Sequence, residues 1–245
     1  MTPGLANRIC FPYAEKVCCN FPETKEHLPE GKAVVTGTPI RPELLCGDAA
    51  AGRAFCGFTD DRPVVMVMGG SLGSVNVNTN VRKALPGLLE HYQVVHLCGK
   101  GNRDQSLEGT EGYVQYEYIK EELPDLFAMA DVLISRAGAN AICEISALAK
   151  PNLLIPLSAH ASRGDQILNA RSFEKQGYSL VLEEEELSTE KLLAAVQELY
   201  ENREKYAAAM RSGGQTDSID VILGLIEEAA AAGKAPRRRT HRKKS

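Results

Sequence analysis

Short apolar runs alternate with amphipathic segments along most of this chain, starting near residue 61. The five residues Val64 to Met68 are all apolar and lack the polar alternation of a half-solvated strand, which predicts a strand covered on both faces of a parallel sheet. Further strands are predicted at 94–98, 114–118, 131–135, 152–156 and 179–182. Helices are predicted at 75–89, 121–130, 139–148, 165–176, after Ser188 and at 219–232. This order predicts an α/β fold with a doubly wound, Rossmann-like parallel sheet.

The first 36 residues have a different pattern. Residues 5–16 suit a helix and residues 17–21 and 33–35 form short apolar runs, but these pieces cannot build a core by themselves. We interpret residues 1–36 as the end of a preceding domain and residues 37–60, which open with the rigid Gly37-Thr38-Pro39, as a connector. The main domain is then 61–232, and 233–245 is a basic, disordered tail.

A tight glycine turn follows the first predicted strand of the main domain. Gly69 and Gly70 permit positive φ, and the helix after them begins with N–H groups that have no partner inside the helix. This arrangement favours an anion, most simply a phosphate, above the strand. The alternative is a sharp turn in which Ser71 only caps the helix. The glycine spacing, which includes Gly73, differs from the dinucleotide fingerprint.

Further candidate residues follow other strands, whose carboxyl ends form the binding edge of such sheets. Gly138 opens a second helix from a strand end, and Glu144 inside it can accept hydrogen bonds from the hydroxyls of a ribose. Gln166 and Asn169 lie one turn apart at the start of the next helix and can read the hydroxyls of a sugar. For each side chain the alternative is an ordinary exposed position on a helix.

Composition and charge narrow the class of protein. No apolar run approaches the roughly 20 residues of a membrane-spanning helix, and no secretory signal opens the chain. Seven cysteines without Cys-x-x-Cys spacing favour reduced thiols and a cytoplasmic protein. Residues 1–233 carry 21 basic and 32 acidic residues, a formal charge of −11, which argues against nucleic acid as the main partner. The basic tail could touch anionic lipid or be a solubilising end. No histidine has partners at metal spacing, so we expect no metal site.

Three motifs together resemble the MurG family of glycosyltransferases, family 28. They are Gly69-Gly70-Ser71-Leu72-Gly73, Arg136-Ala137-Gly138-Ala139 with Glu144 five residues on, and Asp165-Gln166-Ile167-Leu168-Asn169-Ala170. The likeness extends to residues 3–8 and 36–41 and covers the chain to about residue 232. The family implies a GT-B architecture, in which two Rossmann-like domains face each other and the C-terminal one holds the nucleotide sugar.

The resemblance also implies a donor site for UDP-N-acetylglucosamine, with no cofactor. Gly70 and Ser71 would contact the diphosphate, the backbone of Ile119 would hold the uracil, and Glu144 would take the ribose hydroxyls. Gln166 and Asn169 would read the sugar. The remaining implied contacts come from Asn7, Arg41, Ala139, Asn140, Ala141, Ile142 and Cys143. Thr38 stands where the family usually has asparagine, so no role is carried over for that side chain.

The implied reaction moves N-acetylglucosamine, with inversion, to a lipid-linked muramyl-pentapeptide in peptidoglycan synthesis. The acceptor domain of the family has no counterpart here, so we expect a donor-binding half that is inactive alone, with an unidentified general base. It could be a truncated reading of a longer gene or one chain of a split enzyme, as in the two-subunit eukaryotic relatives that make lipid-linked chitobiose. A UDP-sugar epimerase, a regulatory module that binds UDP, and a purely structural subunit remain alternatives. The resemblance places the protein in the cytoplasm, with the inner face of the cell membrane as an alternative site of attachment.

Overall fold

The chain divides into two compact units, each of which is described by itself. The computed structural model describes residues 3–70, 73–159, 164–213 and 218–234. Residues 1–39 and 216–245 make the first unit, and residues 40–215 make the second. Within the described ranges no helix is both long enough and apolar enough to cross a membrane.

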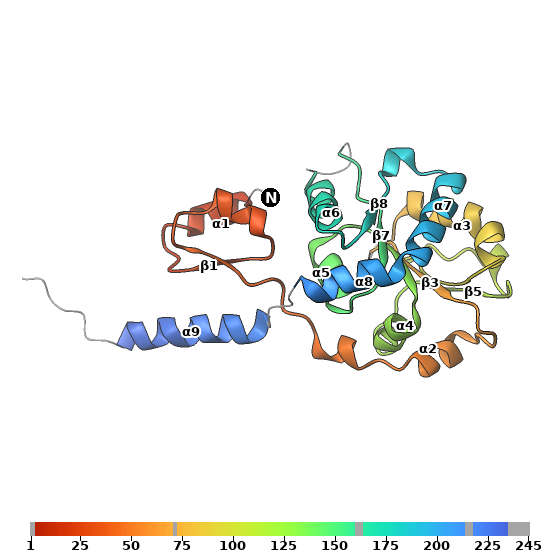
Figure 1. Cartoon of the computed structure of the whole chain (residues 1–245), viewed down its shortest axis with the longest axis horizontal. Helices are drawn as coiled ribbons and strands as arrows, with labels where there is room; N and C mark the ends of the chain where they lie inside the picture. The colour runs from red at the N-terminus through yellow and green to blue at the C-terminus, as the bar shows by residue number, and fades with distance from the viewer. Residues whose placement is uncertain (1–2, 71–72, 160–163, 214–217, 235–245) are drawn as a thin grey trace, which may run out of the picture. The chain divides into compact units, whose positions relative to one another are not determined.

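The first unit is small and discontinuous in sequence (Figure 1). Its strands β1 (Val17–Cys19) and β2 (Ala33–Val35) pair in parallel, and the helices are α1 (Leu5–Cys10), the 3-10 turn η1 (Pro22–His27) and α9 (Ser218–Lys234). Helix α1 ends at Cys10, six residues earlier than the pattern predicts. Pro12 accounts for the difference, because a proline has no N–H and cannot donate the next helical hydrogen bond, to the carbonyl of Arg8.

The second unit is built on a six-stranded parallel sheet in the order β5-β4-β3-β6-β7-β8. The strands are β3 (Val64–Met68), β4 (Gln93–Leu97), β5 (Tyr113–Tyr116), β6 (Val132–Ser135), β7 (Asn152–Leu154) and β8 (Leu180–Val181). Numbered along this unit the order is 3-2-1-4-5-6, that of a doubly wound dinucleotide-type fold. The predicted fold class is therefore confirmed for this unit, with strand ends displaced by one or two residues.

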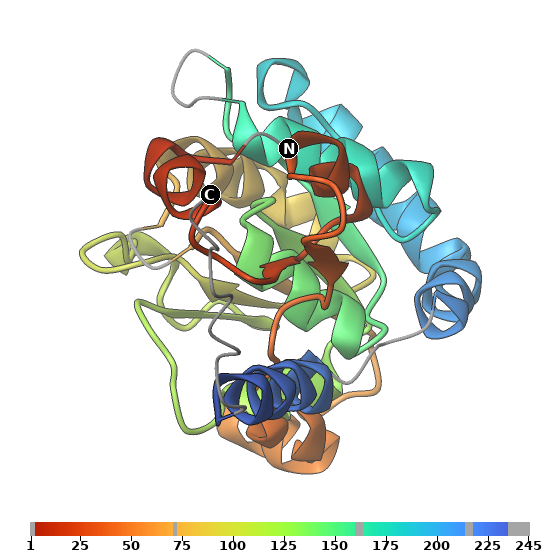
Figure 2. The same ribbon diagram turned by 90° about the vertical axis from the view of Figure 1, so that its left-hand side faces the viewer.

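Helices cover both faces of this sheet (Figures 1 and 2). Val65 and Val67 of β3 share one core cluster with residues of α3 (Val75–Leu89) and α7 (Thr189–Glu201), while Val64 and Met66 share another with residues of α4 (Leu123–Met129) and α5 (Ala139–Ala147). These four side chains have no exposed surface, as expected for an all-apolar central strand. The other elements are η2 (Pro42–Cys46), α2 (Ala49–Cys56), η3 (Gln105–Leu107), α6 (Asp165–Lys175), η4 (Glu184–Glu186) and α8 (Arg203–Ser212).

Helix α8 is an element that the sequence pattern did not predict. It buries only Tyr206, Ala207 and Met210, and the rest of its sequence is charged residues, alanine and one serine. Such a narrow apolar stripe gives little periodic signal. Only Asn202 separates the start of α8 at Arg203 from the end of α7 at Glu201, so the sequence gives no clear boundary between the two helices.

A buried hydrogen-bonded chain fixes the start of α3 against the end of β4. Asn78 Nδ2 donates to the carbonyl of Cys98 (2.8 Å), so Asn78 Oδ1 faces His96 Nε2 (2.9 Å), which must carry its proton. His96 Nδ1 then accepts from the Tyr113 hydroxyl (3.0 Å). Burial, assisted by the charge of Arg82, lowers the pKa of His96 to about 3. The neutral imidazole is the form that this chain of hydrogen bonds needs.

This network predicts a pH-dependent stability. The unfolded chain takes up a proton on His96 below about pH 6.5, and the folded chain resists that proton down to about pH 3. The free energy of unfolding should therefore fall by about 1.4 kcal/mol more per pH unit below pH 6.5 in the unaltered chain than in His96→Gln. Urea unfolding between pH 5 and pH 8 measures this slope.

His91→Gln provides the matched control for this experiment, since His91 is exposed. It should leave the slope unchanged. If His96→Gln does not fold, the ring signals of His96 in the nuclear magnetic resonance spectrum of the unaltered chain still test the argument. A ring that becomes protonated above pH 5 in the folded state would contradict it.

Candidate functional site

A pocket of about 510 Å³ opens at the carboxyl ends of β3 and β6. These two strands are hydrogen-bonded neighbours, yet β4 and β5 lie between them in the sequence, so the strand order reverses here. In doubly wound sheets ligands bind at this reversal. The pocket is lined by Met68, Gly69, Gly70, Gly73, Ser74, Val75, Asn76, Ser135, Arg136, Gly138, Ala141, Leu157, Gln166 and Glu184.

The glycine turn after β3 has the conformation that its sequence predicts. Gly70 and Gly73 have φ values of 86° and 73°, a region that other residues rarely adopt. A Cβ on Gly73 would lie 2.1 Å from the carbonyl oxygen of Cys98, so the turn packs directly on the end of β4. The loop is therefore held close to the neighbouring strand, and its shape depends on glycine at position 73.

Two helices begin at the pocket. Helix α3 has Ser74 as its N-cap, whose hydroxyl accepts from the Val77 N–H (3.3 Å). Helix α5 has Gly138 as its N-cap and no side-chain hydrogen bond there, and a Cβ on Gly138 would meet nothing within 4 Å. Both N-termini therefore present N–H groups and positive dipole ends to the same space, which favours an anion.

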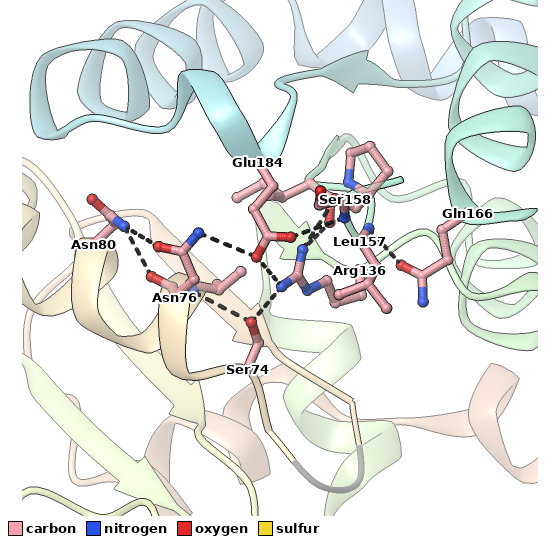
Figure 3. Close-up of polar contacts among 11 residues, drawn as sticks. Ser74, Asn76, Asn80, Arg136, Leu157, Ser158, Gln166 and Glu184 are labelled. Atoms are coloured by element: carbon pink, nitrogen blue, oxygen red, sulfur yellow. Dashed lines mark hydrogen bonds and ion pairs between the residues drawn. The ribbon is translucent and has the colours of Figure 1, made fainter. Parts of the chain in front are cut away.

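One guanidinium joins the loops around the pocket (Figure 3). Arg136, the residue after β6, donates through Nη1 to the carbonyls of Ile155 and Pro156, both at 3.1 Å. Its Nη2 donates to Ser74 Oγ at 2.6 Å and to Glu184 Oε1 at 2.5 Å. Arg136 thus connects the segments that follow β6, β7 and β8 to the N-cap of α3.

Glu184 completes this cluster from the opposite side of the pocket. Its Oε2 accepts from the backbone N–H of Ser158 (2.9 Å), and its Oε1 also accepts from Asn76 Nδ2 (3.2 Å). Burial raises the pKa of Glu184, but the hydrogen bonds from Arg136 and Ser158 outweigh it, so the pKa lies below its usual value. Glu184 is therefore ionised at neutral pH.

The charges of the pocket lining balance. Of the lining residues that the structure describes, Arg136 and Glu184 are the charged ones. Their side chains are each 10% exposed, and they form an ion pair with each other. An anion bound here would therefore meet backbone N–H groups and hydroxyl donors rather than an unpaired cation. Among the described residues, no cluster of histidine, cysteine, aspartate or glutamate side chains could hold a metal ion.

The structure brings several of the predicted site residues to this pocket. Gly70, Ala141 and Gln166 line it. Gln166 Oε1 accepts from the Leu157 N–H (3.0 Å), which leaves its amide N–H groups available to a ligand. Ala139 and Asn140 form the first turn of α5, close to the lining residue Ala141.

Glu144 and Arg41 are placed together by the fold. Arg41 Nη2 lies 3.2 Å from Glu144 Oε1, and the side chains are 54% and 20% exposed respectively. Glu144 is therefore more than an isolated, solvated glutamate of a helix. Because the pair is partly exposed, its net contribution to stability is small, and the carboxylate stays accessible for a second partner.

Other predicted residues are buried or committed to contacts within the protein. Ile119 is 9% exposed and its side chain packs in the core, so the role predicted for its backbone does not involve the side chain. Ile142 is 1% exposed, and Cys143 lies half-buried next to it on α5. Asn169 is 6% exposed and donates to the carbonyl of Ala137 (2.9 Å).

Two sequence candidates cannot be placed at this pocket. Asn7 lies on α1 in the first unit, which is described separately from the second. Ser71, the predicted contact of the diphosphate, lies outside the described residues. Their roles remain predictions.

The sequence analysis assigned no role to Ser74, Arg136 or Glu184. Arg136 stands in a motif at a strand end, so its position indicated that it lies near the binding edge of the sheet. The sequence did not indicate which residues it would contact. Glu184 lies in a run of four glutamates, Glu183 to Glu186, which reads as solvated surface. None of the seven cysteines forms a disulfide.

Comparison with known proteins identifies the family. The family model described as the glycosyltransferase family 28 C-terminal domain matches residues 64–222. A relative from Lachnospira eligens, named UDP-N-acetylglucosamine–N-acetylmuramyl-(pentapeptide) pyrophosphoryl-undecaprenol N-acetylglucosamine transferase, is 62% identical over 228 residues. A relative of the same name from Lachnoclostridium phytofermentans is 61% identical. Each match covers 93% of this chain and 64% of the relative, so the chain spans less than two thirds of these proteins.

Solved structures support the fold. The crystal structure of Acinetobacter baumannii MurG superimposes with a TM-score of 0.71 at 24% identity, over 93% of this chain and 64% of that one. The calicheamicin glycosyltransferase CalG4 gives a TM-score of 0.59 at 18% identity, over 88% of this chain and 55% of that one. The parallel sheet with its flanking helices is thus the Rossmann-like fold of GT-B glycosyltransferases, and the chain belongs to glycosyltransferase family 28, whose C-terminal domain it carries in residues 64–222.

Proposed function

We propose that this chain is the donor-binding portion of a glycosyltransferase that moves N-acetylglucosamine from UDP-N-acetylglucosamine to a lipid-linked muramyl-pentapeptide. The observation that carries the proposal is the pocket at the reversal between β3 and β6, where the N-termini of α3 and α5 meet. The names of relatives more than 60% identical supply the sugar nucleotide and the acceptor. The reaction belongs to peptidoglycan synthesis in this proposal.

The diphosphate would lie at the two helix N-termini. Backbone N–H groups near Gly70, together with Ser71 as implied by the family motif, would hold it. Negative charge develops on the leaving diphosphate as the glycosidic bond breaks, and fixed N–H dipoles stabilise that charge without reorganising. The balanced charges of Arg136 and Glu184 support this assignment, since these dipoles are the positive features left for an anion.

The nucleoside and sugar would extend to either side of the diphosphate. The backbone of Ile119 would hold the uracil, residues 139–143 would line the nucleotide, and Glu144 would accept from the ribose hydroxyls. Gln166 and Asn169 would read the N-acetylglucosamine, with Arg41 and Asn7 completing the donor site. The pairing of Arg41 with Glu144 supports this assignment, because it holds the carboxylate in place next to a second predicted residue of the donor site.

The acceptor would be bound by a part of the enzyme outside the matched region. We propose that residues 1–36 belong to that acceptor domain, that residues 37–60 connect it to the donor domain at 61–232, and that 233–245 is a tail. The remainder would be supplied by the same polypeptide or by a separate chain. Because the acceptor is attached to a lipid, the reaction would take place at the cytoplasmic face of the cell membrane.

Removal of the Glu144 carboxylate should weaken donor binding. Two hydrogen bonds from ribose to a carboxylate are lost in Glu144→Ala, which we expect to raise the dissociation constant of UDP-N-acetylglucosamine about 10- to 100-fold. Calorimetric titration measures this change. UDP lacking the ribose 2′-hydroxyl should bind the unaltered chain more weakly than UDP does. It should lose less affinity in Glu144→Ala than UDP loses, because only one of the two hydrogen bonds is left to remove.

Glu204→Ala, at an exposed position on α8, is the control and should bind as the unaltered chain does. UDP-glucose should bind more weakly than UDP-N-acetylglucosamine, and NAD should not bind. Equal affinity of Glu144→Ala and the unaltered chain for the donor would remove Glu144 from the site. No binding of any uridine nucleotide by the folded chain would contradict the proposed function.

Donor binding without transfer is the expected behaviour of this chain alone. Incubation with radiolabelled UDP-N-acetylglucosamine and a lipid-linked muramyl-pentapeptide should give no labelled lipid, because the acceptor site is incomplete. Addition of the part of the Lachnospira eligens relative outside the match should restore transfer. Donor binding without transfer in that mixture would instead favour a regulatory module, and an altered sugar nucleotide would favour an epimerase.

A further inference from the structure

Ser74 has a hydroxyl proton that the described protein does not use. Its side chain lines the pocket, although the residue is only 8% exposed. Its Oγ accepts two hydrogen bonds, from the Val77 N–H at 3.3 Å and from Arg136 Nη2 at 2.6 Å. Both partners are donors only, and the guanidinium stays protonated at any ordinary pH.

The direction of this proton follows from the geometry of a hydroxyl. A serine oxygen has two lone pairs and one proton. Val77 and Arg136 occupy both lone pairs, so the proton must point away from both of them. Within the described part of the chain the Ser74 hydroxyl donates no hydrogen bond, and the neighbouring carboxylate of Glu184 is bonded to Arg136, Asn76 and Ser158 instead. A buried donor without an acceptor is unfavourable unless a ligand accepts from it.

From these contacts we propose that Ser74 is a further substrate-binding residue, whose hydroxyl donates to an oxygen of the donor's diphosphate. This inference rests on the proposed function and adds a contact beyond the predicted one of Ser71. Ser74 is the N-cap of α3, the helix whose dipole points to the same anion. One residue therefore caps the start of the helix and faces the ligand.

The Arg136–Glu184 pair keeps this hydroxyl in one orientation. The guanidinium of Arg136 donates through Nη1 to the carbonyls of Ile155 and Pro156 and through Nη2 to Glu184 (Figure 3). These three contacts fix the position of Nη2, which also donates to Ser74. The Ser74 hydroxyl is therefore pre-oriented before a ligand arrives. A donor in a fixed orientation loses little entropy on binding. Arg136 contributes to affinity through Ser74, while its own charge is neutralised.

Calorimetric titration of the unaltered chain and its variants with UDP and with uridine tests the proposal. Ser74→Ala should weaken UDP binding about ten-fold or more, since a hydrogen bond to a charged oxygen is lost. Uridine carries no phosphate and should bind equally to both proteins. Ser74→Thr keeps the hydroxyl and both of its acceptor contacts, so it should bind UDP within about three-fold of the unaltered chain.

Ser188→Ala is a matched control for the loss of an N-cap. Ser188 caps α7 and accepts from the Lys191 N–H at 3.3 Å, the same contact that Ser74 makes with Val77. This variant should lower the melting temperature as Ser74→Ala does but leave UDP binding unchanged. Hydrogen exchange at the first turn of each helix shows whether that helix still begins at the same residue.

Several results would overturn the proposal. Unchanged UDP affinity in Ser74→Ala is one, and an equal loss of affinity for UDP and uridine is another. The backbone amides at the start of α3 could exchange freely in Ser74→Ala while those of α7 stay protected in Ser188→Ala. The loss of UDP affinity would then result from loss of helix structure. With α3 intact, Ser74→Thr binding as weakly as Ser74→Ala would also contradict it. Absence of UDP binding by the unaltered chain would contradict the proposed function itself, whereas UDP binding that does not depend on Ser74 would contradict this inference alone.

Discussion

The ion pair between Arg136 and Glu184 is the interaction on which the pocket depends. Both side chains are almost withdrawn from water, and taking two charges out of water costs several kcal/mol for each ion before their attraction offsets it. Such a pair is weak evidence for extra stability. Its effect is geometric, because the guanidinium also binds two carbonyls beyond β7 and the cap of α3. Loops that follow different strands are thereby held in one arrangement.

The same pair determines how the pocket can attract an anion. Lysine-rich phosphate sites rely on mobile unpaired charges, whereas here Arg136, the cation among the described lining residues, is already paired with Glu184. What remains is the dipole of a 15-residue helix, a second helix start without a side-chain cap, and hydrogen-bond donors in fixed directions. These features are directional, so they discriminate by the position of oxygens as well as by charge. A site of this kind suits a diphosphate that must be held in one pose while a bond to it breaks.

The sequence predicted the parts of this structure that depend on local pattern. The all-apolar run of Val64 to Met68 predicted a central strand, and the glycines after it predicted a turn with positive φ, as Gly70 and Gly73 show. The rule that ligands bind at the carboxyl ends of strands then placed the pocket correctly. The partner of Arg136 could not be predicted in this way. Glu184 is 48 residues distant and looks like surface, and only the strand order brings it to the pocket.

The roles of polar side chains were harder to predict than the positions of helices and strands, because these roles also depend on tertiary contacts. An amide such as Asn169 reads as a sugar contact by its chemistry, but the fold also uses it to hold the Ala137 carbonyl. Helix α8 was missed because only three of its side chains are buried, so its pattern lacks a periodic stripe. Local sequence carries the period of an element, while tertiary contacts decide how each polar group is shared between structure and ligand.

The discontinuous first unit has a consequence for the order of folding. Its two segments, residues 1–39 and 216–245, are separated by the whole of the second unit, and Gly37 lies beside Ser218 across that gap. During synthesis the earlier segment emerges before the second unit, so its contacts with residues 216–245 can form only after the last helix has emerged. The second unit, continuous in sequence, can be complete by then, and contacts between distant segments form slowly in any case. Residues 1–39 are thus made before the second unit, although the unit that they belong to is completed only after it.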